Sequence, residues 1–143
     1  MDEGADLHFI EGCSAPKYNV ANLHAGCVEL FVGKNARLRY STIENWSKNM
    51  YNLNTKRALV EEGGTIEWVS GSFGSHVSYL YPMSILKGRD SKMEFTALHL
   101  PAKARIWIQA PKLFILEKIQ VLILILNLFQ RMAVSVHSVH PLL

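Results

Sequence analysis

The stretch RLRYSTIENW, residues 37–46, alternates by twos along its whole length. Successive side chains of a strand point to opposite faces, so this stretch has two distinct faces. One face would carry Leu38, Tyr40, Thr42, Glu44 and Trp46, and the other Arg37, Arg39, Ser41, Ile43 and Asn45. No segment within residues 1–96 has a convincing period of 3.6 residues, so the stretch predicts a strand in an all-β protein.

Further strand-like runs lie on both sides of this stretch and are separated by turn signals. CVELFV (residues 27–32) ends at GKNA (33–36), where Gly and Asn tolerate left-handed backbone. EEGGT (61–65) and KGRDSK (87–92) mark two more turns. Strands with regularly spaced turns predict a β-sandwich or a β-solenoid. Because there is no Asn-Gly or Asp-Gly hairpin signal and the polar residues mix between faces, we favour the solenoid.

Composition excludes several classes of function. The 143 residues are enough for one domain, and the net charge of +3 is ordinary. Lys and Arg are scattered, which argues against nucleic acid as a partner. Cys13 and Cys27 cannot build a disulfide framework or a four-cysteine metal site. The start, MDEGADLH, is no secretory signal, so we expect a reduced, cytoplasmic protein.

Three longer stretches carry a family resemblance: EGCSAPKYNVANLHAGCVEL (11–30), YSTIENWSKNMYNLNTKRA (40–58) and GSHVSYLYPMSILKGRDSKMEF (74–95). They resemble the core domain of the SufB/SufD family of the SUF iron–sulfur cluster assembly system, and YNLNTKRA favours the SufB branch. The resemblance implies a right-handed parallel β-helix. It also implies a scaffold rather than an enzyme, which works with the SufC ATPase and SufD. Such a scaffold receives sulfur from a cysteine desulfurase through a sulfur-transfer protein and holds a nascent iron–sulfur cluster.

Cys13 is the residue on which this resemblance places the chemistry. It lies in EGCSAP, which we interpret as a turn between strands, and it matches the sulfur-accepting cysteine of the family. Sulfur acceptance needs an accessible thiolate, and thiolate is also the natural ligand of an iron–sulfur cluster, so Cys13 is the one candidate metal ligand. The alternative is a small buried hydrophobic residue. Cys27 is predicted as core packing, and His8, His24 and His76 as structural residues.

Four other residues match family positions on a polar route inside the β-helix that leads away from the acceptor cysteine. They are Thr42, Glu44, Trp46 and Lys56. Glu44 stands where many relatives have Gln, so the route would be more acidic here. Polar groups in a low-dielectric interior would help persulfide sulfur to move by offering it hydrogen bonds. The alternatives are plain packing for Thr42 and Trp46 and a solvated side chain for Lys56.

Residues 97–143 differ from the rest, with Glu117 as their one acidic residue and no glycine. Where the family continues with a glycine-rich polar stretch, this chain has ALHLPAKARIWIQAPKLFILEKIQVLILILNLFQ. Read one base out of frame, its codons allow the family pieces AGKGQ, DTG, KNTSS and SKSISK. We therefore predict a frameshift after about residue 96, a partial core domain over 1–96 and no genuine domain over 97–143. The hydrophobic tail is expected as helix or irregular strands.

Two further expectations concern the chain as a whole. Met1 falls at an internal position of the family, so we expect an internal fragment that is inactive in assembly by itself. One alternative is a small membrane-anchored protein that uses Leu113–Val134, but charged residues interrupt that run, and a span needs about 20 apolar residues. No membrane partner is therefore expected. The other alternative is a β-solenoid binding module without sulfur chemistry.

Overall fold

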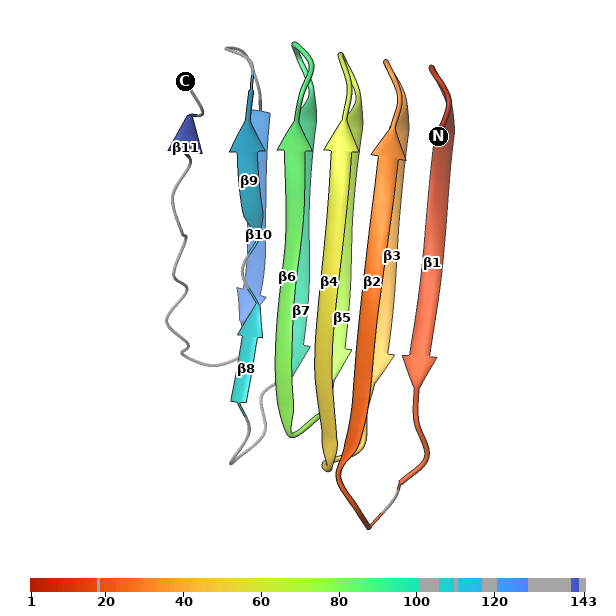
Figure 1. Cartoon of the computed structure of the whole chain (residues 1–143), viewed down its shortest axis with the longest axis vertical. Helices are drawn as coiled ribbons and strands as arrows, with labels where there is room; N and C mark the ends of the chain where they lie inside the picture. The colour runs from red at the N-terminus through yellow and green to blue at the C-terminus, as the bar shows by residue number, and fades with distance from the viewer. Residues whose placement is uncertain (18, 101–105, 110, 117–120, 129–139, 142–143) are drawn as a thin grey trace.

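The computed structural model describes residues 1–17, 19–100, 106–109, 111–116, 121–128 and 140–141. Within these residues the chain contains strands and no helix (Figure 1). The strands are β1 (Asp6–Ser14), β2 (Asn22–Val32), β3 (Arg37–Asn45), β4 (Met50–Val60), β5 (Thr65–Phe73), β6 (Val77–Leu86), β7 (Lys92–Leu100), β8 (Ile106–Gln109), β9 (Lys112–Ile115), β10 (Val121–Leu128) and β11 (His140–Pro141).

The chain winds alternately through two parallel sheets. The first sheet has the order β1-β3-β5-β7-β10, and the second has the order β11-β9-β6-β4-β2, with β8 also pairing with β6. In Figure 1 the chain rises along the second sheet, in front, and descends along the first, behind, as it advances from β1 towards β11. This winding is right-handed, as crossovers between parallel strands almost always are. The predicted all-β, right-handed solenoid is confirmed.

The space between the two sheets is filled by inward-facing ladders of like side chains. In the first sheet Tyr40, Trp68 and Phe95 are successive Cα partners, and all three are buried. The alternation predicted for residues 37–46 is confirmed, because Leu38, Tyr40, Thr42, Glu44 and Trp46 are all buried. Each coil buries its apolar row only against the coils on either side, so packing between neighbours holds the solenoid together.

Close backbone approach explains one glycine in the turns. Gly74 has φ +83°, and a Cβ at this position would stand 1.9 Å from the carbonyl oxygen of Trp46. The backbone N–H of Trp46 in turn donates to the carbonyl of Phe73 at 2.9 Å. Only glycine tolerates this conformation and this contact without strain. The turn after β5 therefore seats the backbone of Trp46 at the edge of the interior.

The described part of the tail continues the two sheets. β10 pairs in parallel with β7, from Val121 opposite Lys92 to Leu128 opposite His99, and Leu113 of β9 joins the buried core. Of the two expectations for the tail, helix or irregular strands, the described residues form strands, because an apolar alternating run can extend a parallel ladder that is already present. Residues 101–105, 110, 117–120, 129–139 and 142–143 lie outside the described residues. The domain boundary at residue 96 and the frameshift stay predictions.

The membrane alternative rested on the run 113–134. Among the described residues, no helix is long and apolar enough to cross a membrane. Residues 117–120 and 129–134 of that run lie outside the described part of the chain.

The outer face of the first sheet is held by a cluster of ion pairs. Glu67 of β5 is only 4% exposed, and it accepts hydrogen bonds from Arg37 Nε at 2.6 Å and Arg39 Nε at 2.5 Å. Burial by itself raises the pKa of Glu67, but the two guanidinium groups outweigh it and hold the pKa below its ordinary value of 4.5. The folded state therefore favours the ionised carboxylate.

This pKa shift predicts a loss of stability in acid. A carboxyl group whose pKa is lower in the folded than in the unfolded chain stabilises the fold above its unfolded pKa, and this stabilisation disappears as the pH falls through the folded pKa. In urea unfolding between pH 7 and pH 3, we expect Glu67→Gln to reduce the decline of the free energy of unfolding below about pH 4.5. The reduction is at most about 1.4 kcal/mol per pH unit. An unchanged acid decline in this variant would contradict the assignment.

Candidate functional site

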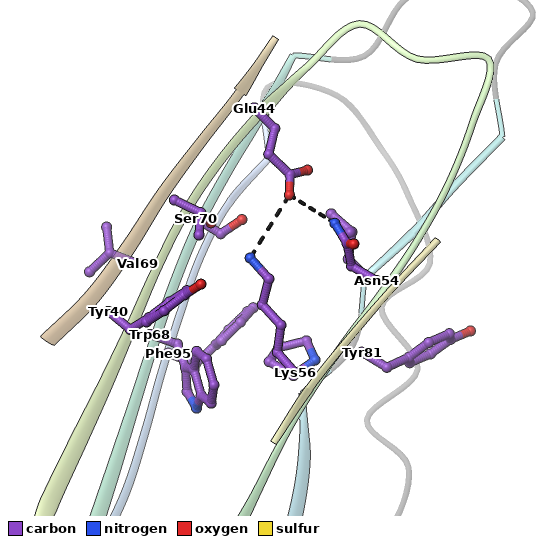
Figure 2. A pocket seen from close by; sticks show the side chains of 12 residues that line it. Tyr40, Glu44, Asn54, Lys56, Trp68, Val69, Ser70, Tyr81 and Phe95 are labelled. Atoms are coloured by element: carbon purple, nitrogen blue, oxygen red, sulfur yellow. Dashed lines mark hydrogen bonds and ion pairs between the residues drawn. The ribbon is translucent and has the colours of Figure 1, made fainter. Parts of the chain in front are cut away.

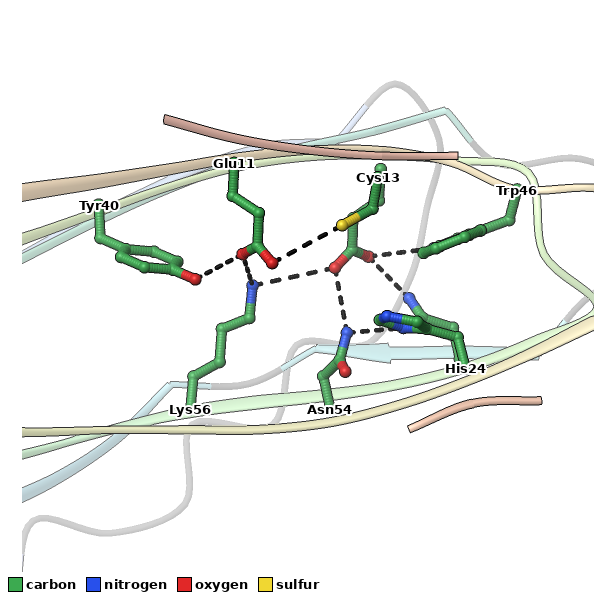
Figure 3. Close-up of polar contacts among 9 residues, drawn as sticks. Glu11, Cys13, His24, Tyr40, Trp46, Asn54 and Lys56 are labelled. Atoms are coloured by element: carbon green, nitrogen blue, oxygen red, sulfur yellow. Dashed lines mark hydrogen bonds and ion pairs between the residues drawn. The ribbon is translucent and has the colours of Figure 1, made fainter. Parts of the chain in front are cut away.

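A network of polar side chains crosses the solenoid interior between β1 and β3 on one side and β2 and β4 on the other (Figure 3). Period-two alternation turns every second side chain of each strand inward, and the parallel register brings these positions to the same level. The members of the network are Glu11, Cys13, His24, Tyr40, Glu44, Trp46, Asn52, Asn54 and Lys56. Five of them lie on β3 and β4, which are distant from β1 in the sequence: Tyr40, Glu44, Asn52, Asn54 and Lys56.

Glu44 lies at the centre of this network and is 3% exposed. Its carboxylate accepts hydrogen bonds from Asn52 Nδ2 at 2.7 Å, Asn54 Nδ2 at 3.1 Å and Trp46 Nε1 at 3.4 Å. The ring of His24 lies against that of Trp46, with 4.6 Å between centroids, and its Nδ1 is 3.0 Å from Asn52 Oδ1. A buried carboxylate is costly unless it is hydrogen-bonded, so these donors are what make Glu44 tolerable in the interior.

Lys56 supplies the positive charge of the network. Its Nζ lies 3.7 Å from Glu11 Oε2 and 3.9 Å from Glu44 Oε1, and it also lies over the ring of Tyr40. The Lys56 side chain is only 12% exposed. The alternative of a solvated lysine is therefore wrong, because the alternation of side chains along β4 turns Lys56 inward and places it between two carboxylates.

Cys13 lies at one side of the network, within β1 rather than in the turn that the sequence suggested. Strand β1 extends through Ser14 because it pairs with β3 along its whole length, with Cys13 opposite Glu44. The Cys13 thiol is partly buried, and its Sγ donates to Glu11 Oε1 at 3.6 Å. Burial raises the pKa of Cys13, and the negative charges of Glu11 and Glu44 raise it further.

Glu11 links the thiol to the rest of the network. Its Oε2 accepts a hydrogen bond from the hydroxyl of Tyr40 and also faces Lys56. Burial raises the pKa of Glu11, but the Tyr40 hydroxyl and the Lys56 charge outweigh it, so the pKa is lower than its ordinary value. Burial and Glu11 raise the pKa of Tyr40, which keeps its hydroxyl a donor. An ionised carboxylate therefore stands beside the Cys13 thiol.

A small cavity adjoins this network, and its lining includes the polar residues Thr42, Glu44 and Lys56. Figure 2 shows Glu44 and Lys56 from close by. Its volume is about 20 Å³, which is enough for roughly one water-sized molecule. Trp68 and Phe95 line its other side. The cavity therefore lies where the polar network meets the aromatic side chains of the core.

The structure brings all five predicted site residues, Cys13, Thr42, Glu44, Trp46 and Lys56, into one interior. Sequence reasoning missed five other members of the network: Glu11, His24, Tyr40, Asn52 and Asn54. A usable signal was present for three of them, because Tyr40 shares the predicted face of residues 37–46 with Glu44, and two amides share a face with Lys56. Asn52, Asn54 and Lys56 are spaced by two, so a strand that turns the lysine inward also turns both amides inward.

Two further expectations concern Cys27 and a metal site. Cys27 is exposed on the outer face of β2, so its predicted role in core packing is wrong. The apolar run around it misled because the outer face of β2 is itself apolar. Within the described residues, no three His, Cys, Asp or Glu side chains are arranged to hold a metal ion. Cys13 as a metal ligand stays a prediction.

Comparison with known proteins agrees with this architecture. The model of the SUF system FeS cluster assembly SufBD core domain matches residues 1–109. An iron–sulfur cluster assembly SufBD family protein of Staphylococcus aureus (strain MRSA252) is 45% identical over 105 residues, which cover 73% of this chain and 23% of that protein. A Staphylococcus saprophyticus protein of the same description is 44% identical over the same shares. No solved structure matches the chain.

The chain thus spans about a quarter of the length of these curated relatives, 23% in each. The family match covers β1 to β8 and so includes every residue of the polar network. The fold, the interior network and the sequence match agree, and the chain belongs to the SufBD core domain family of SUF-system iron–sulfur cluster assembly.

Proposed function

We propose that this chain carries the sulfur-accepting segment of a SufB-type scaffold for iron–sulfur cluster assembly, with Cys13 as the acceptor. The observation that carries the proposal is the buried polar network that begins at the Cys13 thiol and includes Glu44, Trp46 and Lys56. At the same level the next coil carries neutral side chains, with Ser72 opposite Glu44 and Pro82 opposite Lys56, so a solenoid that served only as a rigid spacer would not need a buried carboxylate and ammonium here.

In the proposed reaction the Cys13 thiolate attacks the outer sulfur of a persulfide on a donor protein. A new S–S bond forms on Cys13, the S–S bond of the donor breaks, and the donor cysteine leaves as a thiolate. The thiol must first lose its proton to the solvent, because the neighbouring Glu11, whose Oε1 accepts a hydrogen bond from Sγ at 3.6 Å, has a pKa below its ordinary value and is a weak base. Because the pKa of Cys13 is raised, acceptance becomes faster as the pH rises.

The proposed route continues from Cys13 into the interior along Thr42, Glu44, Trp46 and Lys56. The ammonium of Lys56 favours an anionic persulfide, and the indole N–H of Trp46 can donate a hydrogen bond to it. Glu44 opposes the anion, so it must stay paired with its amide donors or with Lys56 for sulfur to pass. The adjacent cavity has room for one small group.

The wider context is proposed from the SufB branch of the family. The SufC ATPase and SufD are the assembly partners, and a cysteine desulfurase with a sulfur-transfer protein supplies the sulfur in the cytoplasm. The nascent iron–sulfur cluster is then the product that the complete scaffold builds, and the scaffold itself is no enzyme. Because this chain spans 23% of its relatives, we expect no cluster on it alone.

A persulfide assay tests the role of Cys13. The chain is incubated with a cysteine desulfurase, its sulfur-transfer partner and cysteine, then alkylated and analysed by peptide mass spectrometry. We expect one added sulfur atom on Cys13, with a yield that rises between pH 7 and pH 9, because the pKa of the thiol is raised. Cys13→Ser should abolish the added sulfur.

Cys27→Ser is the matched control, because Cys27 is exposed on the outer face and reaches solvent more easily than Cys13. This variant should accept sulfur as the parent chain does. Sulfur on Cys27 with none on Cys13, in a chain whose circular dichroism shows folded strands, would sink the proposal. It would instead favour a β-solenoid binding module without sulfur chemistry.

A further inference from the structure

The Glu11 carboxylate lies between two donors that suit an anion. Its Oε2 is 3.7 Å from Lys56 Nζ and accepts a hydrogen bond from the Tyr40 hydroxyl. The ammonium group of Lys56 also lies 5.1 Å from the centre of the Tyr40 ring, so the two donors form one compact unit. A cation and a hydroxyl that converge on one oxygen, from β4 and from β3, favour a negatively charged group between them.

The two donors are fixed in the interior, whereas Glu11 has access to water. Tyr40 is 3% exposed and the Lys56 side chain 12%, but the Glu11 side chain is 34% exposed. Glu11 also lines an open hollow of about 490 Å³ beside β1. A change of side-chain rotamer would turn its carboxylate towards solvent and leave both donors in place. This site can therefore exchange one anion for another.

The Cys13 thiol lies directly beside the carboxylate that fills this site (Figure 3). Its Sγ donates to Glu11 Oε1 at 3.6 Å, while the other oxygen of the same carboxylate faces Lys56. An S–S bond is about 2 Å long, so a sulfur atom added to Sγ on this side would overlap the carboxylate unless Glu11 moved. Sulfur that enters the interior from Cys13 must therefore displace Glu11.

We propose that Lys56 and Tyr40 form the anion site that receives the sulfur accepted by Cys13, and that Glu11 occupies this site until the sulfur arrives. This inference rests on the proposed function. The Cys13 thiolate bonds to the outer sulfur of the donor persulfide, and the donor cysteine leaves as a thiolate. The outer sulfur, now an anion on Cys13, replaces the Glu11 carboxylate between the two donors. One anion replaces another, so the buried charge stays balanced and Glu11 turns to solvent.

Alkylation of Cys13 by neutral iodoacetamide and by anionic iodoacetate tests the anion site without a sulfur donor. Both reagents attack the thiolate, so the ratio of the iodoacetate rate to the iodoacetamide rate at one pH is independent of the ionised fraction. We expect Glu11→Gln to raise this ratio about fivefold, the effect of one unit charge removed about 4 Å away in water. In Glu11→Gln/Lys56→Met the ratio should fall back towards that of the parent, because the cation is gone.

Cys27 is the internal reference, because it is exposed on the outer face of β2 and its ratio should be the same in every variant. Glu3→Gln is the matched control: it makes the same charge change at an exposed turn residue and should leave the ratio at Cys13 unchanged. Circular dichroism establishes that each variant retains its strands. An unchanged ratio in folded Glu11→Gln, or a ratio that stays equally high in the folded double variant, would overturn the proposal.

The persulfide assay separates this inference from the proposed function. With the same sulfur donor we expect Glu11→Gln to load sulfur on Cys13 several times faster than the parent, and an equal rate would contradict the displacement of Glu11. A raised alkylation ratio with no sulfur on Cys13 in any variant would overturn the proposed function but support the anion site. Sulfur on Cys13 with an unchanged alkylation ratio would support the proposed function and overturn the anion site.

Discussion

Replacing Lys56 by methionine is expected to lower the free energy of unfolding by about 3 kcal/mol. Methionine keeps the length and the apolar stem of the side chain but removes the ammonium group that lies 3.7 Å from Glu11 and 3.9 Å from Glu44. Two carboxylates then face each other across the interior without a cation between them. The effect lies at the low end for a broken buried pair, because the Glu11 side chain is 34% exposed and keeps some contact with water.

Urea unfolding followed by circular dichroism measures this loss. Lys87→Met is the matched control: Lys87 also binds a glutamate, Glu61, at 2.9 Å, but its side chain is 53% exposed. An exposed ion pair contributes about 1 kcal/mol or less, so this control should change little. Adding Glu44→Gln to Lys56→Met should recover part of the lost stability, because it removes one of the unpaired charges. Equal effects of the two lysine variants would show that Lys56 is not buried between carboxylates.

Truncation of Phe95 to alanine is expected to cost about 3–5 kcal/mol. Phe95 is 1% exposed and continues the inward ladder of Tyr40 and Trp68 in the first sheet. Parallel coils are joined only through such ladders and their backbone hydrogen bonds, so neighbouring coils cannot move in to fill the space. The loss therefore combines lost burial with a cavity that stays open.

The midpoint of thermal or urea unfolding measures the effect of Phe95→Ala. Ile10→Ala is the control, since Ile10 is 63% exposed on the outer side of β1 and its truncation should cost less than about 1 kcal/mol. A variant of Phe95 that unfolds at the same midpoint as the parent would mean that β7 does not pack as a coil of the solenoid. The result would then also bear on where the core domain ends.

The sequence alone indicated which side chains of a strand point to the same face. Alternation in residues 37–46 placed Thr42, Glu44 and Trp46 on one face, and that face is the interior. The sequence also indicated turn residues such as Asn35, which adopts φ 53°, because few residue types tolerate a left-handed backbone conformation. These are local properties, set by the geometry of a strand or a turn and by neighbours in the chain.

The sequence misled where a pattern had two readings. The apolar run around Cys27 fitted a core strand, but the sulfur atom lies on the outer face because β2 is apolar on both sides. Lys56 fitted both an interior position on the family's polar route and a solvated surface position, because an isolated lysine in a strand is usually solvated, and the structure places it in the interior. In both cases the sequence correctly predicted a strand, but it did not determine which face of that strand points to the interior.

Pairing between distant strands is what only the tertiary structure decided. Glu11, Tyr40 and Lys56 lie on β1, β3 and β4, and nothing local in the sequence indicates that they meet. They meet because the parallel register of the first sheet sets Cys13 opposite Glu44, and because the second sheet faces it at the same level. By itself the sequence determined an all-β chain with its inward residues and its family. The winding of two sheets around one interior then assembled those residues around the Cys13 thiol.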